Sequence, residues 1–130
     1  MNEMLCKAKR IDNGEWVEGY YVCLNEKEHR IYNGYAETDC GDYYPDYYTV
    51  DPKTVCHYTG LPDKNGRKVF SNEIVMFGFA PCVIKWDAPN ARYMFYENGK
   101  YLRNGLNEDT MKSKEIVGNV FDNPELLKEV

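Results

Sequence analysis

The sequence predicts an all-β fold, or an α+β fold dominated by β-strands, and three observations point to it. Aromatic residues favour strands, and the chain has 12 Tyr and 5 Phe. Asn-Gly dipeptides, which suit two-residue hairpin turns, occur at 13–14, 33–34, 65–66, 98–99 and 104–105. Residues 83–87 alternate between two faces as a half-buried strand does. We therefore expect antiparallel hairpins that include a small barrel-like sheet.

The N-terminal part, residues 1–50, is expected to form a group of hairpins. Strands at 5–11 and 15–24 flank the first Asn-Gly pair, and shorter strands at 30–32 and 35–38 flank the second. Residues 39–48 contain Gly, Pro and three acidic residues, which interrupt a regular period. We expect a loop there that leads into a strand.

The barrel-like sheet is expected over residues 54–120. A strand at 54–58 precedes a hairpin closed at 63–66, and the apolar runs 73–79 and 81–87 form the next pair. Strands at 91–97 and 100–102 flank Asn98-Gly99, and a last strand covers 114–120. Residues 123–129 begin Asn-Pro, a capping residue followed by the favoured first helical residue, so they predict a short C-terminal helix. Together, residues 1–130 are expected to form a single domain.

Charge and hydropathy disfavour several classes of function. Sixteen Lys and Arg stand against 21 Asp and Glu, so the formal charge of -5 offers no basic field that would attract nucleic acid. The N-terminus has no signal-peptide core, and no stretch has the apolar length that spans a bilayer. We therefore expect a cytoplasmic protein that does not bind membranes, and the net charge disfavours binding of nucleic acid.

The five cysteines are expected to be reduced thiols that fill apolar positions. They are odd in number, widely separated and without a Cys-x-x-Cys pair, which argues against a disulfide framework or a zinc site. They are Cys6, Cys23, Cys40, Cys56 and Cys82. With only two histidines in the chain as well, we expect no metal and no cofactor.

The segment Tyr58-Thr-Gly-Leu-Pro-Asp-Lys-Asn-Gly-Arg-Lys-Val-Phe-Ser-Asn-Glu-Ile-Val75 resembles the central signature of the YopX family of phage and prophage proteins. That signature carries a Tyr-Thr-Gly-Leu, Asp-Lys-Asn-Gly, Asp-Ile-Val pattern. Residues 7–10, 13–21, 116–121 and 123–127 are similar to the ends of the family, in the same order. One departure lies at Asn72-Glu73, where the family usually has Gly-Asp, so either no positive φ is needed there or Asn supplies it.

The resemblance implies a phage or prophage accessory protein that acts in a bacterial host and self-associates. It brings no catalytic residues to this chain. Its motifs are mainly those of turns.

Three groups of residues are candidates for chemistry. Asp63, Asn65 and Gly66 resemble part of an EF-hand calcium loop, but the Gly and Glu that the loop requires at later positions are Lys68 and Ile74 here, so a hairpin turn explains them better. The acidic cluster of the 39–46 loop and the Cys56-His57 pair are the other two. Adjacent strand residues point to opposite faces, so Cys56 and His57 cannot form a dyad without a bulge or a residue from elsewhere. The acidic cluster consists of Asp39, Asp42 and Asp46.

The sharpest candidate is a group of tyrosines that could contact a partner. Exposed tyrosines bury a large area in protein interfaces at low entropic cost, and they can also stack on unpaired bases. Packing of these rings in the core is the alternative. The group comprises Tyr43, Tyr44, Tyr47 and Tyr48.

Three functional hypotheses follow. The first is a non-enzymatic, homo-oligomeric accessory protein that binds a host or phage protein. The second is a single-stranded nucleic-acid-binding domain that uses aromatic stacking, although the acidic residues beside the tyrosines oppose it. The third is an enzyme whose polar residues converge in a pocket in a way that the sequence does not reveal.

Overall fold

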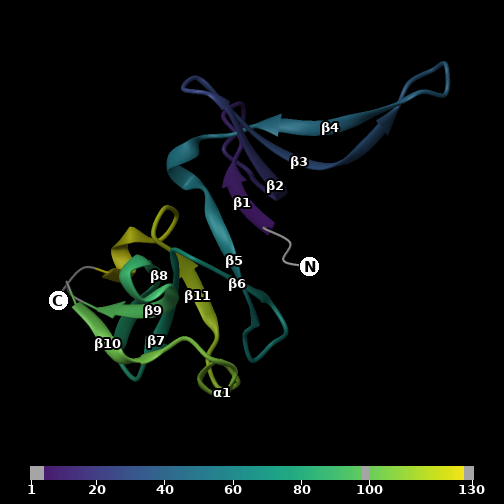
Figure 1. Cartoon of the computed structure of the whole chain (residues 1–130). Coiled ribbons are helices and arrows are strands. Elements are labelled where there is room, and N and C mark those ends of the chain that lie inside the picture. The colour runs from purple at the N-terminus through teal and green to yellow at the C-terminus, as the bar shows by residue number, and fades with distance from the viewer. Residues whose placement is uncertain (1–4, 98–99, 128–130) are drawn as a thin grey trace. The chain divides into compact units, whose positions relative to one another are not determined.

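The computed structural model describes residues 5–97 and 100–127, and the side chains of 100–104 are outside the description. The chain forms two compact units, Met1–His57 and Tyr58–Val130. Antiparallel strands dominate both units, so the prediction of a mainly β fold is confirmed. Figure 1 shows the strands of each unit in chain order by colour.

The first unit is a twisted antiparallel sheet in the strand order β4-β3-β2-β1-β5. The predicted opening hairpin is confirmed, since β1 and β2 pair around Asn13-Gly14 and Gly14 has a φ of +74°. The core of the unit lies on one face of this sheet and includes Ala8, Val17 and Ile31. The elements are β1 (Leu5–Lys9), β2 (Trp16–Asn25), β3 (Glu28–Glu37), β4 (Tyr43–Thr49), the 3-10 helix η1 (Pro52–Thr54) and the beginning of β5 (Cys56–Pro62).

The expected hairpin around Asn33-Gly34 is wrong. These residues lie inside β3, where the register with β4 shifts by one residue between Tyr32 and Gly34, so Asn33 is the extra residue of a bulge. A continuous β3 can pair with the whole of β4, whereas a hairpin at this point would form only a few cross-strand pairs. Residues 39–42 form the turn, and the strand that follows begins at Tyr43.

The second unit contains the end of β5, paired with β6, and a five-stranded antiparallel sheet in the order β10-β9-β8-β7-β11. The predicted hairpins at 63–66 and between 73 and 87 are confirmed, while Asn98-Gly99 lies outside the described residues. The elements are β6 (Lys68–Phe70), β7 (Glu73–Phe77), β8 (Ala80–Asp87), the 3-10 helix η2 (Ala88–Asn90), β9 (Arg92–Glu97), β10 (Lys100–Gly105), α1 (Glu108–Met111), β11 (Ile116–Asn119) and the 3-10 helix η3 (Pro124–Leu127).

The expected barrel-like sheet is not formed, because the sheet is open, with β10 and β11 at its two edges. A small barrel buries one face of each strand and exposes the other. Here both faces of β8 are buried: Ile84 faces the main core with Phe95, while its neighbour Val83 is buried beside Ile74 on the opposite face. Burial of two neighbouring residues on one strand differs from the one-sided burial that the wall of a small barrel would give.

Two helical details differ from expectation. The predicted C-terminal helix is a single 3-10 turn, Pro124–Leu127, and residues 128–129 of the predicted range lie outside the described residues. The short helix α1 was not predicted. The Asn107 side chain caps it by accepting a hydrogen bond from the Thr110 N–H at 2.8 Å.

The positive φ in question at Asn72-Glu73 is supplied by Asn72, whose φ is 69°. Glu73 is fully buried, and its carboxylate accepts hydrogen bonds from the Phe70 N–H at 2.6 Å and from the Arg67 guanidinium at 3.4 Å. This departure from the family pattern therefore preserves the turn between β6 and β7.

Candidate partner-binding site

The candidate site is a two-stranded ribbon, residues 33–48, formed by the outer parts of β3 and β4. The pairing of β2 with β3 ends where Tyr20 lies opposite Tyr32, so beyond this point β3 pairs with β4 alone. Figure 1 shows the two strands running on together past the other strands of the first unit. Most side chains of the ribbon are therefore exposed, whichever face they occupy.

A local turn closes the outer end of the ribbon. The Thr38 N–H donates to the Asp42 carbonyl at 2.7 Å, and the Thr38 hydroxyl accepts from the Asp42 N–H at 3.1 Å. Gly41 has a φ of +85°, a conformation that glycine adopts without strain. The exposed residues Asp39 and Cys40 lie in this turn.

The four tyrosines predicted to contact a partner divide between the two faces of the ribbon. Side chains of a strand alternate, so Tyr43 and Tyr47 lie on one face, and Tyr44 and Tyr48 lie on the other. Tyr43, Tyr44 and Tyr47 are exposed to 70%, 49% and 40%, whereas Tyr48 packs against the core of the first unit. The structure therefore presents three of these rings to solvent on two faces.

Sequence reasoning missed two tyrosines that complete the face of Tyr43 and Tyr47. Tyr32 lies opposite Tyr47, with 5.3 Å between the ring centres, and Tyr35 lies opposite Pro45 and is 76% exposed. The signal that could have found them is the density of tyrosine itself, six between residues 32 and 48. It was hidden because residues 30–38 were assigned to a separate hairpin.

Pro45 interrupts the open edge of β4. The Val50 N–H donates to the His29 carbonyl and the Asp42 carbonyl accepts from the Thr38 N–H, so the even-numbered residues of β4 direct their backbone groups towards β3. Pro45, an odd-numbered residue, has its nitrogen on the outer edge, where proline is tolerated because no hydrogen bond is lost. Pairing of a further strand along this edge would lack one donor at its centre, so the side chains are the better contact surface.

Arg30 covers the inner end of the tyrosine face, the face of the ribbon that carries Tyr32, Tyr35, Tyr43 and Tyr47. Its guanidinium donates to the Glu28 carboxylate at 2.8 and 3.0 Å and to the Tyr32 hydroxyl oxygen at 2.9 Å. It also lies 4.0 Å from the centre of the Tyr47 ring, a cation-π contact. The hydrogen bond that the guanidinium donates to Tyr32, and next those that it donates to Glu28, raise the pKa of Arg30 above its ordinary value.

A second arginine repeats this arrangement on the other face. The Arg10 guanidinium donates to both carboxylate oxygens of Asp12, at 2.9 and 2.6 Å, and lies 4.3 Å from the centre of the Tyr48 ring. Hydrogen bonding to Asp12 raises the pKa of Arg10, and the same bond lowers the pKa of Asp12. Each inner tyrosine of β4 is therefore paired with an arginine that a carboxylate orients.

The ribbon itself is acidic. It carries four carboxylates, and the sequence has no Lys or Arg between Ile31 and Pro52. On the tyrosine face, Glu37 lies directly opposite Tyr43, and on the other face Asp46 precedes Tyr48 by two residues. The four are Glu37, Asp39, Asp42 and Asp46.

The residues considered for catalysis do not converge. In the strand order of the first unit, β3, β2 and β1 separate β4, with its acidic residues, from β5, which carries Cys56 and His57. Cys56 is buried and its Sγ lies 3.2 Å from the Thr54 carbonyl oxygen, while His57 is exposed. The Cys56-His57 dyad is thus not formed.

His57 instead meets a different cysteine. Its Nδ1 lies 3.3 Å from the Sγ of Cys6, on the paired strand β1. Burial raises the pKa of the Cys6 thiol, and a hydrogen bond from the backbone of Tyr21 only partly offsets this. Since the thiolate is the nucleophilic form, a raised pKa opposes a catalytic role for Cys6.

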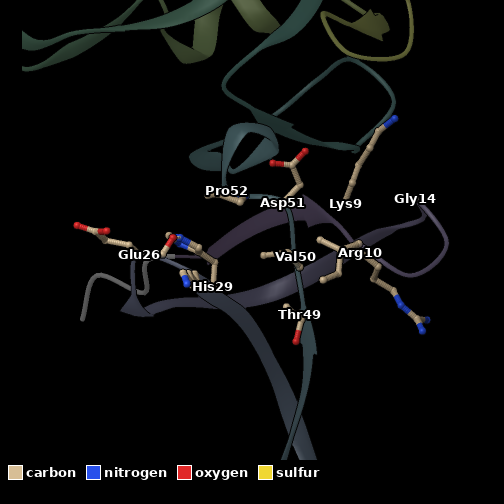
Figure 2. A pocket seen from close by; sticks show the side chains of 11 residues that line it. Lys9, Arg10, Gly14, Glu26, His29, Thr49, Val50, Asp51 and Pro52 are labelled. Carbon is tan, nitrogen blue, oxygen red and sulfur yellow. Dashed lines mark hydrogen bonds between the residues drawn. The ribbon is translucent and has the colours of Figure 1, made fainter.

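A shallow groove of about 420 Å³ lies beside the base of β4 (Figure 2). Its charged residues include Lys9, Arg10 and Glu26, whose charged groups point in different directions in Figure 2. His29 also borders the groove, and its Nδ1 lies 2.6 Å from the Tyr21 hydroxyl. The groove does not bring a set of polar groups onto one point, as a reaction would require.

Asp63, the residue that suggested a calcium loop, has a structural role. Its carboxylate accepts hydrogen bonds from the N–H groups of Asn65 at 2.9 Å, Arg67 at 3.0 Å and Ile116 at 3.2 Å. Burial opposes the charged form, but these bonds outweigh it, with Ile116 contributing most, and lower the pKa of Asp63. Among residues 5–97 and 100–127, no cluster of three or more metal-ligating side chains is found.

The cysteines of the chain are divided between exposed and buried positions. All five cysteines lie in the described part of the chain and are thiols, with Cys23 and Cys40 exposed and the other three buried. No helix in the described part is long and apolar enough to cross a bilayer.

Comparison with known proteins identifies one family. The family model described as YopX protein matches residues 7–128, nearly the whole chain. No match is found among curated proteins.

Proposed function

The chain belongs to the YopX family, and from this premise we propose that it is a phage- or prophage-encoded accessory protein that binds another protein through the ribbon. It acts in the cytoplasm of a bacterial host and is not an enzyme. The single observation that carries the proposal is the ribbon, which presents exposed tyrosines on a two-stranded extension of the sheet.

Folding alone does not explain the exposed rings. Tyr35 and Tyr43 are 76% and 70% exposed, so their burial contributes little to the stability of the first unit, and Tyr44 leaves 49% of its surface exposed. Large amphipathic rings that stay exposed on a rigid strand bury their area when a partner arrives, and tyrosine is enriched in such interfaces. We therefore infer that these residues contact a protein partner.

A protein partner is favoured over single-stranded nucleic acid by charge. The ribbon adds four carboxylates around the rings and no cation, and phosphate groups would be repelled by them. Stacking of bases on the tyrosines would have to overcome this repulsion at each nucleotide.

Self-association, which the family resemblance implied, stays a prediction. Two ribbons would each bring four carboxylates to a shared interface, so contacts between copies are expected on other surfaces. Sedimentation of the wild-type protein and of a ribbon variant should give the same oligomeric state.

The proposal is tested by affinity capture from a lysate of phage-carrying bacteria, with and without nuclease, read by mass spectrometry. The test variant replaces Tyr35, Tyr43 and Tyr44 by Ser, and the matched control is Phe79→Ser, a fully exposed ring in the second unit. We expect the wild type and the control to retain the same protein after nuclease treatment, and the ribbon variant to lose it. Equal capture by all three would refute binding through the ribbon. Loss of capture after nuclease treatment would favour binding of nucleic acid.

A further inference from the structure

We propose that the ribbon binds an arginine-rich segment of its protein partner, an inference that rests on the proposed function. Its basis is an arrangement that the first unit already contains twice. In both copies an arginine lies over a tyrosine ring and donates hydrogen bonds to a carboxylate.

The two copies occupy the inner end of β4, one on each face. Arg30 lies 4.0 Å from the Tyr47 ring centre and bonds Glu28, and Arg10 lies 4.3 Å from the Tyr48 ring centre and bonds Asp12. Arg10 donates to both oxygens of Asp12, and Arg30 donates twice to one oxygen of Glu28. Guanidinium suits such contacts because it is planar, stacks on aromatic faces and offers several donors in a fixed fork.

The outer part of the ribbon repeats the tyrosine and the carboxylate but lacks the cation. On one face Glu37 lies directly opposite Tyr43, and Tyr35 follows two residues away on the same strand as Glu37. On the other face, alternation places Asp46 beside Tyr44. No Lys or Arg occurs between Ile31 and Pro52, so the chain itself provides no cation from the ribbon.

Charge complementarity therefore specifies the occupant. A partner that brings arginines would reproduce on the outer ribbon the contacts that Arg10 and Arg30 make on the inner part. A second copy of the ribbon would bring carboxylates to carboxylates, and a nucleic acid would bring phosphates to them. Arginine is expected to bind more tightly than lysine because lysine offers a compact charge without a stacking plane.

The probes are fluorescein-labelled nona-arginine and nona-lysine peptides, with binding followed by fluorescence anisotropy. We expect the wild type to bind nona-arginine about fivefold more tightly than nona-lysine, the ratio expected from one exposed cation-π contact. Raising the salt concentration should weaken both, because exposed charge pairs are screened.

Two charge variants separate the ribbon from general attraction to an acidic protein. The ribbon variant replaces four carboxylates by amides, and the control replaces four exposed carboxylates of the second unit. Four negative charges fewer bring the formal charge from -5 to -1 in both. The ribbon substitutions are Glu37→Gln, Asp39→Asn, Asp42→Asn and Asp46→Asn. The control substitutions are Glu108→Gln, Asp109→Asn, Glu115→Gln and Glu125→Gln.

The ribbon variant should lose at least about tenfold in affinity for nona-arginine, the effect of several exposed ion pairs, and the control about twofold or less. Replacing Tyr35, Tyr43 and Tyr44 by Ser should remove the preference for arginine over lysine. Equal losses in the two charge variants, or no preference for arginine in the wild type, would overturn the inference.

The lysate capture then distinguishes failure of this inference from failure of the proposed function. If the ribbon charge variant still captures the protein that the tyrosine variant loses, the ribbon binds a protein but the arginine chemistry is wrong. If both variants lose that protein while the charge control retains it, both proposals are supported. If both variants capture it like the wild type, the proposed function is wrong as well.

Discussion

Replacing Asp63 by Asn should destabilise the second unit. Asp63 is 5% exposed, and its carboxylate accepts three backbone hydrogen bonds, from Asn65, Arg67 and Ile116. The first two hold the turn between β5 and β6, and the third fixes β11, which is distant in sequence. The side chain of Asn has almost the same shape, so the substitution changes charge and hydrogen bonding without creating a cavity.

The magnitude follows from these three bonds. Oδ1 of Asp63 accepts from Asn65 and Arg67, and Oδ2 accepts from Ile116. An Asn side chain has one carbonyl oxygen, which can replace either Oδ1 or Oδ2 as acceptor. The NH2 group then takes the place of the other oxygen and faces a backbone N–H with which it cannot form a hydrogen bond. A hydrogen bond to a charged group is worth about 1.5–3 kcal/mol and one between neutral groups about 0.5–1.5 kcal/mol, and a buried group without its partner costs about 1–3 kcal/mol. Because an amide is also less costly to bury than a carboxylate, we expect a net loss of about 2–3 kcal/mol in the free energy of unfolding.

Urea unfolding followed by tryptophan fluorescence measures this loss. Trp16 lies in the first unit and Trp86 in the second, so a Trp16→Phe background leaves one reporter of the second unit. The control is Asp39→Asn, which makes the same change of charge at an exposed carboxylate. A loss below about 0.5 kcal/mol for the Asp63 variant would refute the structural role given to this carboxylate.

The same residue gives the stability of the second unit a pH dependence. The pKa of Asp63 is lower in the folded chain than in the unfolded chain, so the folded state binds fewer protons in acid. The stabilisation is therefore present above the ordinary aspartate pKa of about 3.9 and is lost as the pH falls towards the folded pKa. We expect the urea midpoint to fall less steeply below pH ~4 in the Asn variant than in the wild type.

Three further substitutions or reactions test other parts of the structure. By urea unfolding, Asn72→Ala should be less stable than Asn72→Gly by about 1–2 kcal/mol, because alanine resists the φ of 69° that glycine adopts without strain and both variants lose the same side chain. Gly19→Ala should destabilise the first unit by about 2–3 kcal/mol, measured in a Trp86→Phe background, because a Cβ would lie 2.3 Å from the Tyr32 carbonyl oxygen. In the native protein, Cys23 and Cys40 should react with a thiol reagent rapidly and the buried thiols slowly; rapid reaction of all five would contradict the burial.

The hairpins that the sequence predicted correctly are those that local residues determine. Gly14 and Gly66 adopt positive φ values within short turns, at +74° and +81°, and their neighbours supply the hydrogen bonds. Asn72 likewise takes the conformation that the family pattern assigns to Gly. At these positions the backbone conformation is determined by local residues and depends little on distant ones.

The errors lie where distant strands decide the outcome. Asn33-Gly34 has the composition of a turn, but pairing of Tyr32 with Tyr47 continues β3 through it as a bulge. The open edges of the second sheet depend likewise on which strands pair. Burial of both Val83 and Ile84 could not be predicted from the alternation of residues 83–87, which indicates that only one face is buried.

The candidate site was predicted in part. The tyrosines of β4 were identified from their unusual density. Their division between two faces was not predicted, because residues 39–48 were expected to form a loop and β4 is a strand from Tyr43 to Thr49. Tyr32 and Tyr35 became part of the site only through the register of β3 with β4. The arginines over Tyr47 and Tyr48 come from other strands or from the loop after β1, so no local pattern indicated them.

Binding through the exposed rings of the ribbon is tested most directly by capture of a protein from nuclease-treated lysate. The capture compares the wild type with the variant in which Tyr35, Tyr43 and Tyr44 are replaced by Ser. We expect one protein that the wild type and Phe79→Ser retain and the ribbon variant loses, with all three chains folded by circular dichroism. Retention of that protein by the ribbon variant at the wild-type level would contradict binding through these rings.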